Sequence, residues 1–398
     1  MILTRRNALL GLAGSITLGR ASLAVAAAPT DQRFVVVILR GAMDGLSAVV
    51  PYGDPALAGL RGELLPPAPG QENGLLDLGG FFGLHPVLAN FQAMYKDGEL
   101  AVLHAVAGAY RSRSHFEAQD YLESGASQRL TTGWLNRVVA ALPAASGPPT
   151  LRPVDEAFAV GVSVPLLLRG PAPVGSWAPK SFATPSPELY ARIAELHHAD
   201  PVTGPAIAAG LRERGFAAGL DTGDAKGAAR YAFPALAAEA GRMLARLDGP
   251  RIAAMEIGGW DTHAAQMNRL DFPLRQLDTG LGALKTALGP AWAKTAILVM
   301  TEFGRTVRTN GTKGTDHGTG TVAFALGGAV TGGHVFGDWP GLGAGKLLDD
   351  RDLQPTTDLR AVAKGMLAGH LGLNPAALAK VFPGSEGLAP ISGLIRRA

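Results

Sequence analysis

The chain has 398 residues, 47% of them hydrophobic, and its 36 Lys and Arg against 33 Asp and Glu give a formal net charge of +3. A chain of this size can bury a large core, as one big α/β domain or as two smaller domains. The absence of cysteine excludes disulfides, thiolate metal ligands and a cysteine nucleophile, so any metal must be held by oxygen and nitrogen.

The N-terminus resembles an export signal. The pair Arg5-Arg6 precedes a weakly apolar segment and a small-residue stretch at 23–27, which predicts a signal peptide over residues 1–26, use of the twin-arginine translocase and a periplasmic or other extracytoplasmic location. A basic amphipathic start of a cytosolic enzyme is the alternative. The predicted signal peptide contains Arg5, Arg6 and Arg20 and no acidic residue. The formal net charge of the chain without it is therefore 3 − 3 = 0. The sequence has no run of Lys and Arg interleaved with aromatic residues, so nucleic-acid binding is not predicted. It also has no apolar stretch long enough to span a bilayer.

The first strand is predicted at residues 33–39, RFVVVIL, and is followed by Asp44 between Gly41 and Gly45. Glycines let the backbone approach a ligand closely, so Asp44 is a candidate metal ligand, although an ordinary turn Asp explains it as well. Residues 52–80 are rich in Pro and Gly and predict a surface excursion. A helix at 84–95 and a strand at 100–106 are expected next.

Residues 111–117 open a further helix and combine a hydroxyl with basic side chains. Ser114 and Glu117 have the spacing of a capping box, which would account for both. A hydroxyl at a helix N-terminus beside Arg113 and His115 also suits anion binding or nucleophilic attack on phosphorus or sulfur. Ser114 and His115 are therefore candidate catalytic residues.

Residues 140–187 are rich in Pro, Gly and Ser and predict a cap or insertion over the sheet edge. Helical spacing follows at 189–198 and 228–247, and then a strand at 251–257. That strand ends in glycines and in Asp261 and His263. An Asp-x-His pair on a loop can direct both side chains at one cation, whereas a lone His is more often a helix cap. A long helix is expected at 266–288.

The stretch 296–320 carries the densest group of reactive side chains. An apolar strand at 296–300 ends at Glu302 and Arg305, and one Gly-rich loop then brings Asp316 and His317 before a second strand at 322–326. In open α/β sheets, ligands bind outside the carboxyl ends of the strands, so these groups lie where a site is expected. A final helix is predicted at 359–371 with Asp358 as its N-cap.

Six motifs in this order resemble an uncharacterised family of twin-arginine-exported proteins, the domain-of-unknown-function 1501 type, with a sulfatase-like or alkaline-phosphatase-like fold. The motifs are RGAMDGL (40–46), RSHFEAQD (113–120), TGWLNR (132–137), WDTH (260–263), TEFGRT (301–306) and GTDHG (314–318). The resemblance covers nearly the whole chain after the signal. It implies a single α/β domain over 27–398, with a mainly parallel sheet flanked by helices on both faces.

The resemblance also implies two cations at the strand ends. Asp44 would hold one ion with Ser114 as nucleophile, and Asp261, His263 and His317 would hold the other. Glu302 stands where the superfamily places an Asp followed by His, while this chain has its Asp-His pair at Asp316-His317, which leaves one or two ions open. Carboxylate and imidazole ligands favour zinc or manganese over magnesium.

The expected function is metal-dependent hydrolysis or transfer of a phosphate or sulfate ester, with Arg305 offsetting charge in the transition state. A small-molecule anionic ester or an envelope component would be the partner. The chain has no Cys and no Ser-x-Pro-x-Arg, which disfavours a formylglycine sulfatase. The alternatives are a non-catalytic exported binding protein with a degenerate site and a structural cell-envelope component.

Overall fold

A computed structural model describes residues 31–142, 156–161, 164–179 and 232–396. Its main sheet has the strand order β11-β5-β10-β9-β1-β8-β6-β7, with β12 also paired to β5. Only β10 runs antiparallel to its neighbours; all other pairs are parallel. The strands are β1 (Arg33–Leu39), β5 (Leu100–Ala107), β6 (Ala157–Val160), β7 (Gly175–Trp177), β8 (Ile252–Ile257), β9 (Thr295–Thr301), β10 (Thr321–Leu326), β11 (Val335–Phe336) and β12 (Thr357–Asp358).

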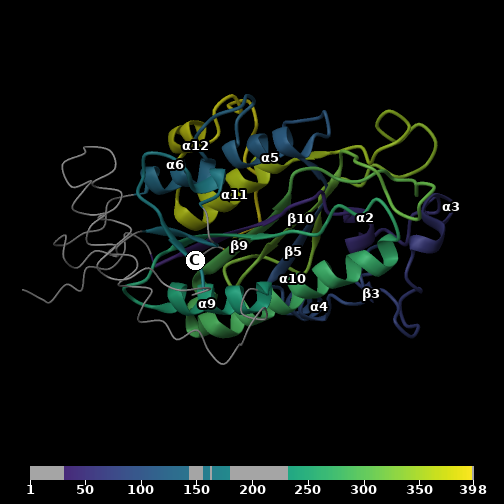
Figure 1. Cartoon of the computed structure of the whole chain (residues 1–398), viewed down its shortest axis with the longest axis horizontal. Helices are drawn as coiled ribbons and strands as arrows, with labels where there is room; N and C mark the ends of the chain where they lie inside the picture. The colour runs from purple at the N-terminus through teal and green to yellow at the C-terminus, as the bar shows by residue number, and fades with distance from the viewer. Residues whose placement is uncertain (1–30, 143–155, 162–163, 180–231, 397–398) are drawn as a thin grey trace, which may run out of the picture.

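Helices cover both faces of this sheet (Figure 1). One face is covered by α4 (Ala89–Lys96), α9 (Phe233–Ala245) and α10 (Gln266–Leu288). The other is covered by α5 (His115–Ser124), α6 (Trp134–Ala141), α11 (Leu359–Leu371) and α12 (Pro375–Val381). Shorter elements are α2 (Gly45–Ala48), α3 (Leu57–Arg61), three 3₁₀ turns at Gly62–Leu64, Leu166–Leu168 and Gly289–Lys294, and a small sheet of β2 (Val49–Val50), β4 (Gly83–Leu84) and β3 (Leu76–Asp77).

The two cores follow from the alternation of side chains along the central strand β1. Val35, Val37 and Leu39 belong to the core under α9 and α10, whereas the intervening residues belong to the core under α6 and α11. Every residue of β1 is buried, and parallel strands buried on both faces read as continuous apolar runs. The predicted class, a mainly parallel sheet with helices on both faces, is confirmed.

Several elements have the predicted bounds, and others are shifted. β1, α10 and α11 lie where the sequence placed them, and the Asp358 side chain caps α11 by accepting from the Arg360 amide. The predicted helix at 84–95 begins only at Ala89. The predicted helix at 189–198 and the signal peptide at 1–26 lie outside the described residues.

The segment 140–187 was expected to form a cap or insertion. In the part that the structure describes, it supplies the edge strands β6 and β7, which extend the main sheet beside β8. This described part is a continuation of the sheet, because its short apolar runs find pairing partners at the open edge of β8. Among the residues that the structure describes, no helix combines the length and the apolar character needed to cross a membrane.

Candidate metal centre

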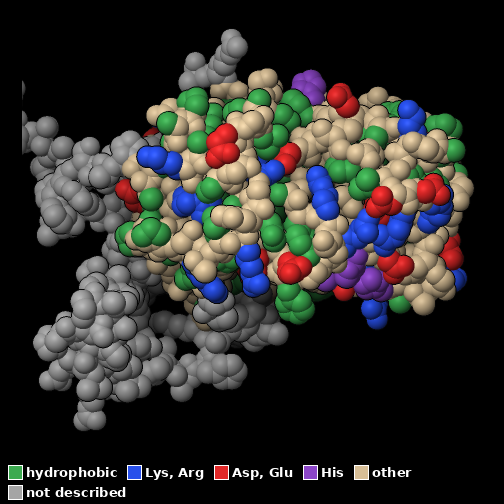
Figure 2. All heavy atoms as spheres, turned by 90° about the horizontal axis from the view of Figure 1, so that it is seen from above, with side chains coloured by type: hydrophobic (Ala, Val, Ile, Leu, Met, Phe, Trp, Pro, Cys, Tyr) green, Lys and Arg blue, Asp and Glu red, His purple; other side chains and the backbone are tan. Residues whose placement is uncertain are grey.

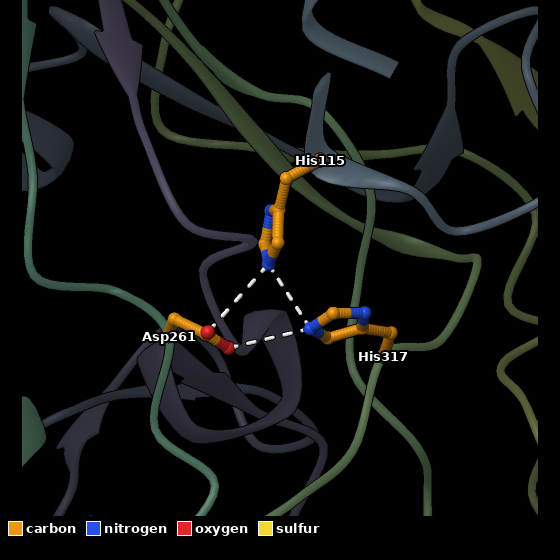
Figure 3. Close-up of side chains that lie close together, drawn as sticks. All are labelled: His115, Asp261 and His317. Atoms are coloured by element: carbon orange, nitrogen blue, oxygen red, sulfur yellow. Dashed lines mark hydrogen bonds and ion pairs between the residues drawn. The ribbon is translucent and has the colours of Figure 1, made fainter. Parts of the chain in front are cut away.

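A cluster of imidazoles lies where the strands β1, β5, β8 and β9 end. His115 is the first residue of α5, which follows β5, and Asp261 and His263 follow β8. His317 precedes β10, the antiparallel strand, so its loop reaches the same edge of the sheet from the opposite direction. Figure 3 shows His115, Asp261 and His317 converging from three separate segments of the chain. On the surface, histidine side chains gather among acidic and basic ones (Figure 2).

The Nε2 atoms of the imidazoles face one another. His317 Nε2 lies 3.0 Å from His115 Nε2 and 3.0 Å from His263 Nε2. The Asp261 carboxylate completes the group, with Oδ1 3.0 Å from His263 Nε2 and 3.4 Å from His317 Nε2, and Oδ2 3.7 Å from His115 Nε2. His115, Asp261 and His317 can direct one ligand atom each to a shared point.

Each imidazole has an acceptor at its other nitrogen. His115 Nδ1 lies 2.8 Å from a Glu302 oxygen, and His263 Nδ1 lies 3.0 Å from an Asp316 oxygen. His317 Nδ1 lies 3.0 Å from the main-chain carbonyl of Arg113. An acceptor at Nδ1 selects the neutral tautomer with hydrogen on Nδ1, which leaves the Nε2 lone pair for a metal. Three lone pairs then converge, and a cation among them would relieve their repulsion.

The spacing of these atoms fits a tetrahedral ion. Zinc–nitrogen bonds of about 2.0–2.1 Å in a tetrahedral site separate neighbouring ligand atoms by about 3.3 Å. Asp261 Oδ1, His263 Nε2 and His317 Nε2 lie 3.0–3.4 Å from one another. His115 Nε2 lies beside His317, and His115, Asp261 and His317 form the group whose ligand atoms can share one ion, with His263 next to it. Imidazole and carboxylate ligands of this kind suit a metal of the zinc type in chemistry.

Arg305 holds the Asp261 carboxylate. The buried Arg305 guanidinium donates to Asp261 Oδ1 at 2.5 Å and to the Thr315 hydroxyl at 3.1 Å. Burial raises the pKa of Asp261, but the hydrogen bond and charge of Arg305 outweigh it, so the pKa lies below its usual value. The carboxylate is therefore ionised and fixed in place. Arg305 therefore lies buried behind Asp261 and binds this carboxylate from the protein interior.

Glu302 and Asp316 were predicted as metal ligands, and the structure places both behind a histidine. Glu302 is buried and accepts from His115, from the Gly41 amide at 2.9 Å, from Gln119 at 3.2 Å and from the Thr301 hydroxyl at 2.9 Å. The hydrogen bond that His115 donates to Glu302 raises the pKa of His115. Asp316 accepts from His263 and, at 3.1 Å, from Asn310. These carboxylates orient imidazoles from the outer layer.

Asp44 does not join the cluster. Its carboxylate is fully buried in an ion pair with Arg61, whose Nη2 lies 3.1 Å from Oδ1, and it also accepts from the Ser47 hydroxyl at 2.7 Å. Arg61 belongs to α3, inside the segment predicted as a surface excursion, yet its side chain is completely buried. The prediction that Asp44 is a metal ligand, with Ser114 as nucleophile, therefore needs correction, because Arg61 already supplies its positive partner.

Ser114 occupies the N-cap position of α5, but its side chain makes no capping hydrogen bond. The predicted capping box is absent because Glu117 instead accepts from the Tyr110 hydroxyl, which also interacts with the Ser114 side chain. His115, predicted as a catalytic residue, lies within the ligand group. Sequence reasoning missed Gln119, although its i, i+4 spacing from His115 on one helix face was a usable signal.

A family model and several solved structures are similar to this chain. Solved structures similar to this chain include the C-terminal periplasmic domain of EcEptC from Escherichia coli in complex with Zn, with 10% identity, 76% of this chain and 74% of that chain covered and a TM-score of 0.33. Phosphonate monoester hydrolase of Agrobacterium radiobacter is 13% identical, with 74% of this chain and 68% of that chain covered and a TM-score of 0.31.

Ps i-CgsB in complex with k-i-k-neocarrahexaose is 10% identical, with 77% of this chain and 68% of that chain covered and a TM-score of 0.36. No curated protein matches the sequence significantly. Residues 187–382 match the model of a family described as "Protein of unknown function (DUF1501)", which confirms the predicted family for that part of the chain.

Proposed function

We propose that the chain is an exported metal-dependent hydrolase or transferase that acts on a phosphate or sulfate ester. The observation that carries the proposal is the convergence of three Nε2 atoms and the Asp261 carboxylate, each fixed from behind by a hydrogen-bond partner. A bound divalent cation would polarise a phosphoryl or sulfuryl oxygen of the substrate. The imidazole-rich donor set favours zinc over manganese.

The protein side chains supply order and electrostatics in this proposal. Glu302 and Asp316 fix the rings of His115 and His263, and Arg305 keeps Asp261 ionised, so the site needs little reorganisation when substrate binds. Phe303 packs its ring 4.8 Å from the His115 ring and 5.1 Å from the His317 ring, which excludes water from one side. A preorganised site of this kind suits the stabilisation of negative charge on the substrate.

The purified mature protein tests the proposal directly. We expect one zinc ion per chain by elemental analysis and turnover of at least one of 4-nitrophenyl phosphate, bis(4-nitrophenyl) phosphate and 4-nitrophenyl sulfate. His317→Ala should lose both metal and turnover. The matched control is His334→Ala, which removes an exposed imidazole outside the cluster. A wild-type protein that binds no metal under metal-replete conditions would refute the proposal.

A non-catalytic metal-binding protein is the second candidate, and one observation favours it. The Ser114 hydroxyl interacts with Tyr110, and among the residues that the structure describes no hydrogen bond links it to an imidazole that could act as its base. A nucleophilic hydroxyl needs such a neighbour or a metal to activate it. A protein that binds zinc tightly, hydrolyses none of the three esters and is unaffected by Ser114→Ala would establish this candidate instead.

Export by the twin-arginine pathway is a further part of the proposal. It rests on the Arg5-Arg6 pair and the small residues that follow, all outside the described residues. Replacing Arg5 and Arg6 by lysine should retain the precursor in the cytoplasm, and cell fractionation with an antibody to the mature chain would detect this. Export of the Lys-Lys variant at the wild-type rate would contradict the proposed route.

A further inference from the structure

Asp352 is a buried carboxylate outside the group of candidate ligands, and two arginines surround it. It lies between β11 and β12, and its side chain is inaccessible to solvent. Its Oδ2 accepts hydrogen bonds from Arg113 Nε at 2.9 Å and from the Thr319 hydroxyl at 2.8 Å, and it lies 2.7 Å from Arg113 Nη2 in an ion pair. Its Oδ1 accepts no hydrogen bond from the residues that the structure describes and faces Arg351 Nη1 in an ionic contact of 3.4 Å. One carboxylate thus holds the Arg113 guanidinium by a hydrogen bond and attracts the Arg351 guanidinium by charge.

Both arginines contact His317. The main-chain carbonyl of Arg113 lies 3.0 Å from His317 Nδ1, and Arg351 Nη2 donates to the main-chain carbonyl of His317 at 2.6 Å. The first contact fixes the ring and its tautomer, and the second fixes the backbone that carries the ring. Asp352 therefore connects to the side chain and the main chain of His317 by two separate routes.

The conformation of Arg113 depends on this support. Its φ is +62°, in the left-handed region that non-glycine residues rarely occupy. A residue keeps such a conformation only when its surroundings hold it there. Arg113 Nε and Nη2 both contact Asp352, and these contacts stabilise the conformation. The position of the Arg113 carbonyl that faces His317 therefore depends on the buried Asp352 carboxylate.

We propose that Asp352 is a positioning residue that fixes the His317 ring with hydrogen on Nδ1 and the Nε2 lone pair directed into the cluster. The structural part of this inference stands on the contacts of Asp352, Arg113 and Arg351 alone. Its consequence for metal affinity rests on the proposed metal-dependent function. Outer-layer partners of metal ligands typically contribute about 10–100-fold to metal affinity, and Asp352 acts on His317 through two of them.

The test compares Asp352→Asn with Asp349→Asn. Asp349 contacts the same Arg113 side chain at 3.3 Å, but it is 69% exposed, and a solvent-exposed ion pair contributes little. In metal-free protein at pH 8, nitrogen-15 NMR of the imidazoles, with the His317 signals assigned from His317→Gln, reports the tautomer. We expect wild type and Asp349→Asn to hold hydrogen on Nδ1 and Asp352→Asn to give a tautomer mixture. Zinc affinity, measured by chelator competition, should fall about tenfold or more for Asp352→Asn only.

A second variant keeps the test decisive if Asp352→Asn does not fold. Arg351 is 39% exposed, so Arg351→Gln should fold and lower zinc affinity about two- to tenfold by removing one hydrogen bond to His317. The inference is overturned if the folded variants keep the wild-type tautomer and bind zinc within twofold of Asp349→Asn. If wild type binds no zinc, the proposed function fails, and the NMR comparison alone decides the role of Asp352.

Discussion

Replacing Glu302 by Gln should weaken metal binding while leaving the fold intact. Glu302 is buried, and it accepts from His115 Nδ1 at 2.8 Å and from the Gly41 amide at 2.9 Å. A glutamine has nearly the same shape and keeps one carbonyl oxygen for these donors, but it lacks the charge that makes His115 a better ligand. We expect a loss of about 10–100-fold in zinc affinity, or about 1.4–2.7 kcal/mol.

The assay is competition for zinc between the protein and a chromogenic chelator, with the visible spectrum of the cobalt-loaded protein as a second readout. Glu256→Gln is the matched control, because Glu256 lies at the same end of the sheet and pairs with Arg40 but contacts no imidazole. Thermal unfolding of the metal-free variants identifies any general loss of structure. If Glu302→Gln folds and binds zinc as tightly as Glu256→Gln does, Glu302 does not support a ligand and the reasoning fails.

Three further predictions concern His263 in the cluster, the buried Asp44–Arg61 pair and the buried His370. His263→Ala, which removes a half-exposed imidazole, should cost more zinc affinity than Glu302→Gln but change the free energy of unfolding of the metal-free protein by less than about 1 kcal/mol. Asp44→Ala should lower the free energy of unfolding by about 3–5 kcal/mol by chemical denaturation, because it leaves Arg61 buried without its partner, and zinc affinity per folded molecule should not change. Burial lowers the pKa of His370 to about 4, whereas in the unfolded chain the same imidazole takes up a proton below about pH 6.5. The free energy of unfolding should therefore fall by about 2 kcal/mol between pH 7 and pH 5 on account of this group, and His370→Gln should lack that loss.

The sequence was informative about the fold wherever one strong local pattern sufficed. The continuous apolar run at 33–39 and the long periodic segment at 266–288 gave elements with the observed bounds. Local patterns were weaker where distant pairing decides the structure. The short runs at 157–160 and 175–177 become strands only because β8 offers them an edge, and no local signal distinguishes such runs from loop residues.

The sequence also located the candidate site better than it assigned roles within it. The loops after β8 and β9 were expected to gather acids and imidazoles, and the structure brings Asp261, His263 and His317 together. Which carboxylate faces the centre and which stands behind an imidazole depends on side-chain directions that local sequence does not encode. Asp44 and Glu302 both follow strands, yet Asp44 pairs with Arg61, 17 residues away, and Glu302 pairs with His115, 187 residues away.

The charges around the cluster argue for one ion in place of the two that the family resemblance implies. The carboxylates that face the imidazole rings, Asp261, Glu302 and Asp316, contribute −3, and Arg305, whose side chain binds Asp261, contributes +1; for these four side chains the sum is −2 while the imidazoles are neutral. One divalent cation brings this sum to zero. A second would leave +2 in a partly buried site, and Asp44, the carboxylate that the resemblance assigns to another ion, is already neutralised by Arg61. Desolvated charge without compensation is costly, so we expect the site to bind a single divalent ion.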